Sequence, residues 1–442
     1  MPPLLRRVVE AFRKPVPPAL AAPDQFPPAD IAAMLREIGI AMVEVSQPVQ
    51  VVEQRLLDIA ARYTTQTVQV AVLPTMLIIQ IGGTAYEMGA SVAPSSRFDM
   101  AAAVEDIAER ASAGAIVPAD AVARVHAARL EPPRFGGLVT VIGYALTTVG
   151  FGMTLQPSWK ALLAHLFLGL VVGVVVQIAG PFPSLTPILP TLSAVVVTLM
   201  AIWFVADVAD DGLLRVISPA LIATLPGMAL VIGAIELAAG RIVSGASRTV
   251  YGLAQMGLLV YGVVLGVRIA GQVPPQYPTP SMGPWVLYAS IVVIAVGLYL
   301  YLSAPPGSLI WLLLVISVAT LTQALAGHVL NAAHSGFVAA AVAIPVAVLA
   351  STIRGAPPAG VLTLATFWSL VPGQLTFMSL SRNASQDFAN SSSISVAGGA
   401  IISIALGTLV GWSLVGTLLH RKRQRDNGSP GRIASPTTSV NP

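Results

Sequence analysis

The feature that most constrains the fold is a series of long apolar segments that fills the chain from Phe135 to Leu419. We count ten of them, and each approaches the ~20 residues that a helix needs to cross a hydrocarbon core. Hydrophobic residues make up 55% of the 442 residues and charged residues only 10%, too few to cover a soluble protein of this size. The sequence predicts a polytopic α-helical membrane protein. The predicted spans are 135–155, 161–179, 185–206, 213–237, 249–271, 284–303, 307–325, 336–353, 358–380 and 394–419.

The N-terminal third has a different composition, because residues 1–134 carry 12 of the 24 basic and 14 of the 20 acidic residues. Within this third, the sequence of residues 29–133 predicts a small α/β cytoplasmic domain. We expect a helix from Ser46 and Pro48 to Tyr63, β-rich runs at 67–72 and 75–81 that form a hairpin, and helices near 99–113 and 118–130. Residues 1–28 predict a flexible leader, since no apolar core of a signal peptide follows their basic residues.

The distribution of basic residues predicts the orientation. Ten spans place both ends of the chain on one side, and that side collects eight basic residues against four on the other. The positive-inside rule then places the N-terminal domain and the basic, disordered tail 421–442 in the cytoplasm. The eight are Arg134, Arg241, Arg248, Arg354, Arg421, Lys422, Arg423 and Arg425, and the four are Lys160, Arg215, Arg268 and Arg382.

A short repeat links the two halves of the predicted membrane domain. Leu225-Pro226-Gly227 lies in the fourth span, and Leu370-Val371-Pro372-Gly373 lies in the ninth, 146 residues later. The copies are five spans apart, so they cross the bilayer in opposite directions. We therefore predict two five-helix inverted repeats, 134–272 and 273–420, an arrangement found in many secondary transporters.

Each Pro-Gly pair is a candidate break in a transmembrane helix. Proline frees a carbonyl one turn back, and a helix that restarts at Gly227 or Gly373 presents unpaired N–H groups. Such an end carries about half a positive charge and attracts a carboxylate. The alternative is a simple kink that neighbouring helices satisfy.

Ionisable residues near the apolar segments are candidate proton carriers. Asp207, Asp210 and Asp211 follow the third span, and Glu236 ends the fourth with Arg248 nearby. Intramembrane carboxylates are costly and often mark ion paths. The alternative for most of them is a solvated position at headgroup level, whereas Glu236 is expected to be paired or to carry a proton.

Polar and small residues supply two further patterns. Gln374 and Thr376 follow the second Pro-Gly pair along one helix stripe, where they would hydrogen-bond a small polar substrate or join neighbouring helices. Glycines spaced four apart permit close helix packing, and we expect them to be structural. They are Gly169 and Gly173, Gly262 and Gly266, and Gly407 and Gly411.

Several enzyme and binding classes find no support in the sequence. Zero cysteines exclude disulfides, zinc–thiolate sites and thiol nucleophiles. Neither a phosphate-binding G-x4-G-K-[ST] loop nor a G-x-S-x-G nucleophile elbow occurs, and His328 and His334 lack metal-ligand spacing. We predict no enzyme activity, no cofactor and no metal. The net charge of +4 comes from loops and the tail, so it indicates no nucleic-acid partner.

Most of residues 30–419 resembles the threonine/serine exporter family, in which bacterial proteins join an N-terminal cytoplasmic domain to ten spans. In the soluble part the resemblance rests on Gly39 to Tyr63 and on Val68 to Ile81, and three further stretches carry it. The first is "GAIVPADAVARVHAARL" from Gly114 to Leu130. The second is "LPGMALVIGAIELAAGRIVSGASR", which contains Pro226, Gly227, Glu236 and Arg248. The third is "RGAPPAGVLTLATFWSLVPGQLTF", around the second Pro-Gly pair. The family often has Asp where this chain has Glu236, which keeps the charge.

The resemblance implies a secondary active exporter of L-threonine and L-serine in the bacterial inner membrane, driven by the proton-motive force. On this hypothesis Gly227 and Gly373, with Pro226 and Pro372, receive the substrate carboxylate. Glu236 or freed carbonyls receive its ammonium, and Gln374 and Thr376 bind its hydroxyl. Glu236 or the Asp207–Asp211 group carries the proton. Three alternatives stay open. The first is a dicarboxylate exporter that uses Arg248, Arg354 and both half-helix ends, and the second is a membrane-anchored protein that acts through its cytoplasmic domain. The third is a passive channel, whose downhill flux would not respond to a proton gradient. The oligomeric state is left open, homo-oligomer included.

Overall fold

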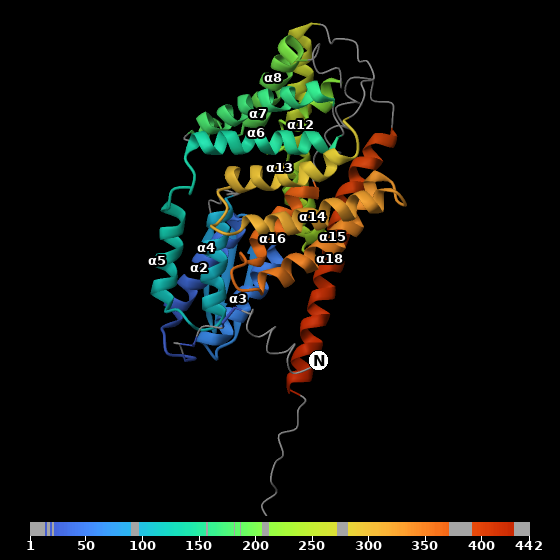
Figure 1. Cartoon of the computed structure of the whole chain (residues 1–442). Coiled ribbons are helices and arrows are strands. Elements are labelled where there is room, and N and C mark those ends of the chain that lie inside the picture. The colour runs from blue at the N-terminus through green and yellow to red at the C-terminus, as the bar shows by residue number, and fades with distance from the viewer. Residues whose placement is uncertain are drawn as a thin grey trace, which may run out of the picture.

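The computed structural model describes residues 14–15, 18–19, 22–89, 97–155, 158–180, 182–185, 187–205, 212–271, 282–370 and 391–427. Two parts of the chain are visible in Figure 1. An N-terminal unit, which we define as residues 28–130, packs against a larger helical bundle, which we define as residues 137–427.

The N-terminal unit combines four helices with a three-stranded antiparallel sheet of order β1-β2-β3. The predicted helices and the first hairpin are confirmed to within a few residues, whereas the first helix and the third strand are additional. Gly114 has φ +69° just after its helix, as expected of a C-terminal cap, and Pro118 begins the next helix. The elements are α2 (Pro28–Glu44), α3 (Val49–Tyr63), β1 (Val68–Leu73), β2 (Met76–Ile81), β3 (Thr84–Gly89), α4 (Phe98–Ser112) and α5 (Pro118–Leu130).

An ion-pair cluster holds α5 against α2. Arg129 donates from Nη1 to Glu37 Oε2 (2.7 Å) and from Nε to Glu44 Oε2 (2.9 Å), so one guanidinium joins two buried carboxylates. Burial alone would raise the pKa of Glu37, but hydrogen bonds from Arg129 and Arg36 hold that pKa below its usual range. This contact is therefore intact at neutral pH and weakens as pH falls through the depressed pKa of Glu37.

The helical bundle holds the apolar segments predicted as spans. Six of its described helices are long and apolar enough to cross a membrane, and four shorter apolar helices accompany them. The last helix extends past the predicted start of the tail at 421, because Arg, Lys and Gln propagate helix well. The elements are α6 (Gly137–Thr154), α7 (Trp159–Ala179), η1 (Pro183–Leu185), α8 (Leu189–Met200), η2 (Ala201–Val205), α10 (Leu213–Ile217), α11 (Gly227–Ala238), α12 (Ile242–Ala270), α13 (Trp285–Tyr301), α14 (Leu309–Gly327), α15 (Ala332–Ser351), α16 (Ala359–Leu370) and α18 (Ser391–Asn427).

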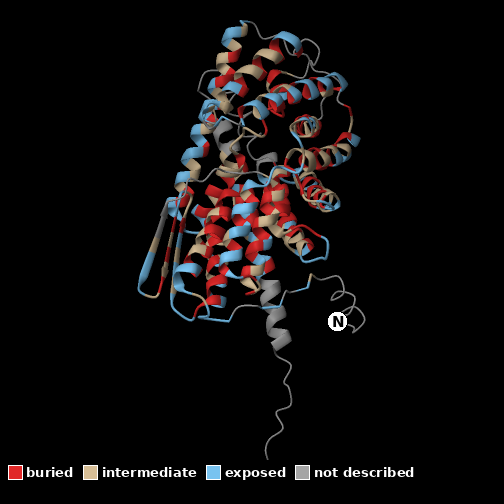
Figure 2. Ribbon diagram, turned by 90° about the vertical axis from the view of Figure 1, so that its left-hand side faces the viewer, coloured by how far each residue is buried: buried red, intermediate tan, exposed pale blue. Residues whose placement is uncertain are grey.

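The outer surface of the bundle is apolar. Large side chains such as Leu163, Ile178, Val250 and Ile310 are exposed along α7, α12 and α14. Figure 2 shows exposed turns on helices in the upper part of the molecule. In water such a surface would drive association, whereas lipid chains solvate it. The chain is a polytopic membrane protein, in agreement with its composition.

Glycines bring the two halves of the bundle into backbone contact. A Cβ atom added to Gly150 of α6 would lie 2.8 Å from the Ile294 nitrogen of α13, and one on Gly297 of α13 would lie 2.5 Å from the Thr147 nitrogen of α6. Both separations are shorter than Cβ atoms tolerate, so only glycine fits at these positions.

Glycines also join two further helix pairs by close backbone contact. Gly262 and Gly266 of α12 press against α8, and Gly407 and Gly411 of α18 press against α15. A Cβ on Gly262 would lie 2.6 Å from the Thr191 carbonyl oxygen, and one on Gly407 would overlap the Phe337 carbonyl. The structural role expected of these spaced glycines is confirmed.

The fourth predicted span is not a continuous helix. Short α10 is followed by turns over 218–226, and α11 restarts at Gly227 with Pro226 as its N-cap. The Tyr144 hydroxyl of α6 donates to the Ala220 carbonyl (2.6 Å) and so pairs a backbone group that the turns leave outside any helix.

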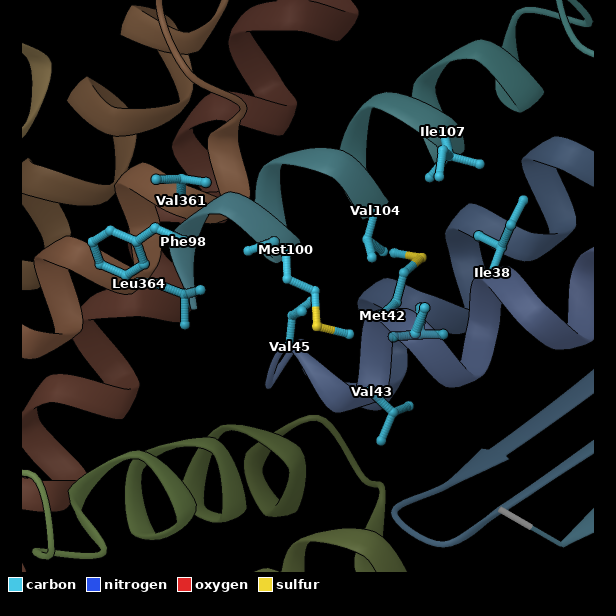
Figure 3. Close-up of a cluster of buried hydrophobic side chains, with 14 of the residues drawn as sticks. Ile38, Met42, Val43, Val45, Phe98, Met100, Val104, Ile107, Val361 and Leu364 are labelled. Atoms are coloured by element: carbon cyan, nitrogen blue, oxygen red, sulfur yellow. The ribbon is translucent and has the colours of Figure 1, made fainter. Parts of the chain in front are cut away.

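The N-terminal unit shares a hydrophobic core with the bundle. Phe98, the first residue of α4, is fully buried and lies between Val361 and Leu364 of α16 (Figure 3). The Phe98 N–H also donates to the Leu302 carbonyl (2.7 Å) just after α13. The interface between the two parts is thus packed and hydrogen-bonded.

Replacing Gly407 with alanine should destabilise the bundle, because the new Cβ would overlap backbone of α15. Overpacking of this kind costs about 1–3 kcal/mol. We expect a lower melting temperature for purified Gly407→Ala in detergent, measured on the full chain. Gly398→Ala on the same helix is the matched control, since nothing lies within 4 Å of its added Cβ. Equal melting temperatures for the two variants would contradict the packing argument.

Candidate functional site

Glu236 is the most deeply buried carboxylate in the described part of the bundle, with none of its surface exposed. Its Oε2 accepts a hydrogen bond from the Ser244 hydroxyl (2.8 Å), and its Oε1 lies 3.3 Å from Arg248 Nε. Ser244 and Arg248 are four residues apart and so share one face of α12. Gly240, at φ +77°, turns the chain between α11 and α12 and lets that face meet Glu236.

Close approach of α11 and α12 makes this arrangement feasible. A Cβ on Gly245 would lie 2.7 Å from the Gly233 carbonyl oxygen, so the two backbones touch one turn from Glu236. Short polar contacts then form between the helices, and the carboxylate and the guanidinium balance each other inside apolar surroundings.

The N-terminal unit supplies the third partner of Glu236. The Val49 N–H, in the first turn of α3, donates to Glu236 Oε1 (3.0 Å). The N-cap of α3 is Pro48, which provides no side-chain cap, so the first N–H groups need an acceptor from elsewhere. Ser46, expected at the helix start, instead has φ +62° in the preceding turn. Glu236 therefore caps a helix of the other part of the protein.

A second ion pair lies one helical turn away. Arg241, the N-cap of α12, contacts Glu53 Oε2 of α3 through Nη2 at 2.8 Å. Glu53 follows Val49 by four residues, so one face of α3 contacts the α11–α12 turn at two points. Arg241 is 44% exposed, so this pair is far more accessible to solvent than the Glu236–Arg248 pair.

Several polar groups on the helices that contact Glu236 are buried without a hydrogen-bond partner among the described residues. They include Arg248 Nε and Nη2, Thr249 Oγ1 and both amide atoms of Gln50, the residue after Val49. The Arg248–Glu236 contact is thus an ion pair at 3.3 Å rather than a hydrogen bond. Buried polar groups are almost always satisfied in folded proteins. The stretches that hold Glu236 therefore carry unused donors and acceptors.

Gly227 lies at the opposite end of α11 from Glu236. It is buried and begins the helix, as the Pro226–Gly227 pair predicts. Nine residues of helix separate it from Glu236, a distance of about 13 Å at 1.5 Å per residue. The ammonium and carboxylate of one amino acid share a single carbon, so one molecule does not reach both ends of α11 at once.

The other predicted site residues lie outside the described residues. These are Asp207, Asp210, Asp211, Pro372, Gly373, Gln374 and Thr376. The structure brings Glu236 and Arg248 together, and it places Pro226 and Gly227 on the same helix as Glu236.

Sequence reasoning missed Ser244, Val49 and Gln50. Ser244 carried a usable signal, because it precedes Arg248 by one helical turn. The signal for Val49 and Gln50 was weaker. A helix that begins after Pro48 lacks a capping side chain, but the neighbouring sequence does not identify which residue accepts hydrogen bonds from its first N–H groups. No group of three or more His, Asp or Glu that could hold a metal occurs in the part of the chain that the structure describes.

The arrangement suits binding of charged small molecules. A buried carboxylate attracts cations, and its guanidinium partner attracts anions. Both properties are typical of ion-coupled membrane proteins.

Comparison with known proteins identifies the family of the chain. Searches of curated proteins and of solved structures returned no match. A protein-family model, ThrE, described as "Putative threonine/serine exporter", matches residues 33–270, from α2 of the N-terminal unit to the end of α12. This region contains Glu236, Arg248 and the contacts of α3 with both helices, and it spans more than half of the chain. The chain therefore belongs to the threonine/serine exporter family.

Proposed function

We propose that the chain is a secondary active exporter of L-threonine and L-serine in the bacterial inner membrane, driven by the proton-motive force through alternating access. The observation that carries the proposal is the Glu236–Arg248 pair, buried in an apolar bundle within the region that matches the family. Burial of an ion pair is a poor source of stability, so its presence favours a functional role. Glu236 is the proposed proton-coupling residue, with Asp207, Asp210 and Asp211 as further proton carriers.

The proposed architecture has ten spans in two inverted repeats, 134–272 and 273–420. Two observations support it. The first helices of the halves, α6 and α13, pack against each other through glycines, and in each half the fifth helix packs on the third through glycines four residues apart. The excess of basic residues on one side supports cytoplasmic termini, which places the N-terminal unit at the cytoplasmic end.

The proposed transport site lies where the broken spans four and nine meet. Gly227 and Gly373 begin half-helices whose N–H groups favour the substrate carboxylate, and carbonyls near Leu225 and Leu370 favour its ammonium. Gln374 and Thr376 are the proposed partners of the substrate hydroxyl. The start of α11 at Gly227 supports the first half of this arrangement.

Counterflow in proteoliposomes tests the proposed function. The full chain, loaded with threonine, serine, proline or succinate, should exchange threonine and serine selectively and respond to an imposed pH gradient. Glu236→Gln should abolish the response to the gradient while the protein still inserts, and Glu53→Gln is the matched control. Exchange of succinate alone would transfer the function to dicarboxylates. No exchange from folded protein would favour a function carried by the N-terminal unit.

Loosening the N-terminal unit tests whether transport needs it. Phe98→Ala removes the fully buried aromatic side chain through which α4 packs against α16. Such a change lowers the free energy of unfolding by about 3–5 kcal/mol in protein cores. We expect faster proteolysis of the N-terminal unit and a lower exchange rate. Leu130→Ala, at a residue that is 85% exposed, should change neither. Unchanged exchange by Phe98→Ala despite a released N-terminal unit would make that unit accessory.

A further inference from the structure

We propose that the Glu236–Arg248 pair opens to bind the zwitterionic headgroup of an α-amino acid, at a site that the N-terminal unit completes. We call this the inner site and define it as Glu236, Arg248, Ser244 and the Val49 N–H. This inference deepens the proposed function and rests on it, because it names the part of the substrate that is recognised and where the protein first holds it.

The donors around Glu236 are those that recognise a carboxylate. A guanidinium, a hydroxyl and the N–H of a helix first turn converge on its two oxygens. All three already hold a carboxylate in this structure, that of Glu236 itself. A substrate carboxylate that takes these donors leaves Glu236 free to pair with the ammonium on the same substrate molecule.

Charge balance favours this exchange. One buried ion pair and one zwitterion each have no net charge, and together they form two opposite-charge contacts. Neither Glu236 nor Arg248 is then left as an uncompensated buried charge, which would be strongly unfavourable. A dicarboxylate offers no cation to Glu236, so the site discriminates against it.

Unused hydrogen-bonding groups lie in the same stretches of chain. Arg248 Nη2 and the Gln50 amide are buried without a partner among the described residues, so they add a donor on α12 and both a donor and an acceptor on α3. A ligand that forms hydrogen bonds with these groups gains affinity, because the groups are already buried and the ligand displaces no water from them. Because Val49 and Gln50 belong to the N-terminal unit, that unit contributes directly to substrate binding.

The inner site lies about 13 Å from the start of α11 at Gly227, by the helical rise over nine residues. It is therefore distinct from the site proposed at the broken helices. With the N-terminal unit in the cytoplasm, it is the position that an exported substrate reaches first.

Binding at the inner site should weaken as pH falls. A proton on Glu236 removes the partner of the substrate ammonium, so proton and substrate exclude each other, as antiport requires. The other charged groups facing this region are Arg248 and Arg241 on α12 and Glu53 on α3. The apolar cluster around α11 also includes α14, α15, α16 and α18. Residues 309–327, 359–370 and 398–416 of these helices carry no ionisable side chain, and α15 carries one, His334, in its first turn.

Binding of four probes to the purified full chain in nanodiscs, between pH 5 and pH 8, tests the inner site. The probes are L-threonine, L-threoninol (no carboxylate), N-acetyl-L-threonine (no ammonium) and succinate. Wild-type protein should bind threonine at least about tenfold more tightly than the other three, since a hydrogen bond to a charged group contributes about 1.5–3 kcal/mol. Threonine affinity should fall as pH is lowered.

Two variants should change the order of preference in opposite directions. Glu236→Gln should bind N-acetyl-L-threonine at least as tightly as threonine and lose the pH dependence. Arg248→Gln should instead favour threoninol over N-acetyl-L-threonine. Misfolding would lower all affinities together, so it does not produce this reversal. Glu53→Gln is the matched control at the neighbouring ion pair and should keep the wild-type order and pH profile.

The outcomes separate the two proposals. If wild-type protein exchanges threonine but all variants keep the wild-type order and pH profile, the inner site is refuted and the proposed exporter stands. If wild-type protein neither binds nor exchanges threonine or serine, both are refuted. Tightest binding of succinate by wild-type protein would also refute both, because neither provides for a second substrate carboxylate.

Discussion

Direct contact between helix backbones is the constraint on which the rest of the structure depends. Lipid chains are as apolar as leucine, so membrane helices gain little from burying apolar surface against each other and rely on close packing. Here glycines bring α6 to α13, α12 to α8 and α18 to α15. The same contact between Gly233 and Gly245 holds α11 beside α12, and it is this contact that places Glu236 next to Ser244 and Arg248.

Glu236 joins the two parts of the protein as well as balancing Arg248. By accepting the Val49 N–H it serves as the missing cap of α3, and removal of a helix cap generally costs about 0.5–2 kcal/mol. A change in its protonation or pairing is therefore felt by the N-terminal unit as well as by the bundle. In the proposed inner site, a ligand that takes the Val49 N–H from Glu236 would act on α3 as well as on the bundle, and linkage of this kind is reciprocal.

Local chemistry made much of the fold predictable. Segment length and apolarity identified the apolar helices of the bundle, six of which are long enough to cross a membrane. The Pro226–Gly227 pair identified the restart of α11. Gly114 and Pro118 marked helix ends because their backbone preferences are strong. The first helix and the third strand went unpredicted. No residue of α2 after Asp30 is exposed, so few polar positions mark an outer face of this helix. The β3 sequence, TAYEMG, contains only Thr84 and Tyr86 as residues that favour strands.

The candidate site was predictable only in part, because it depends on contacts between distant segments. Glu236 and Arg248 stood out as ionisable groups in an apolar region. Val49 acts through its backbone N–H, and its partner lies 187 residues later in the chain. No periodicity or composition encodes such a pairing; it follows from the docking of α3 onto the α11–α12 turn.

The docking of Phe98 against α16 also sets an order of events during synthesis. More than 260 residues separate Phe98 from Val361, and at about 5–20 residues per second a ribosome needs roughly 15–50 s to make them. Throughout that interval the Phe98 side chain lacks its packing partners on α16, because the ribosome has not yet translated them. A segment made early in synthesis must therefore wait for one made late, so a chain truncated before α16 leaves that surface open.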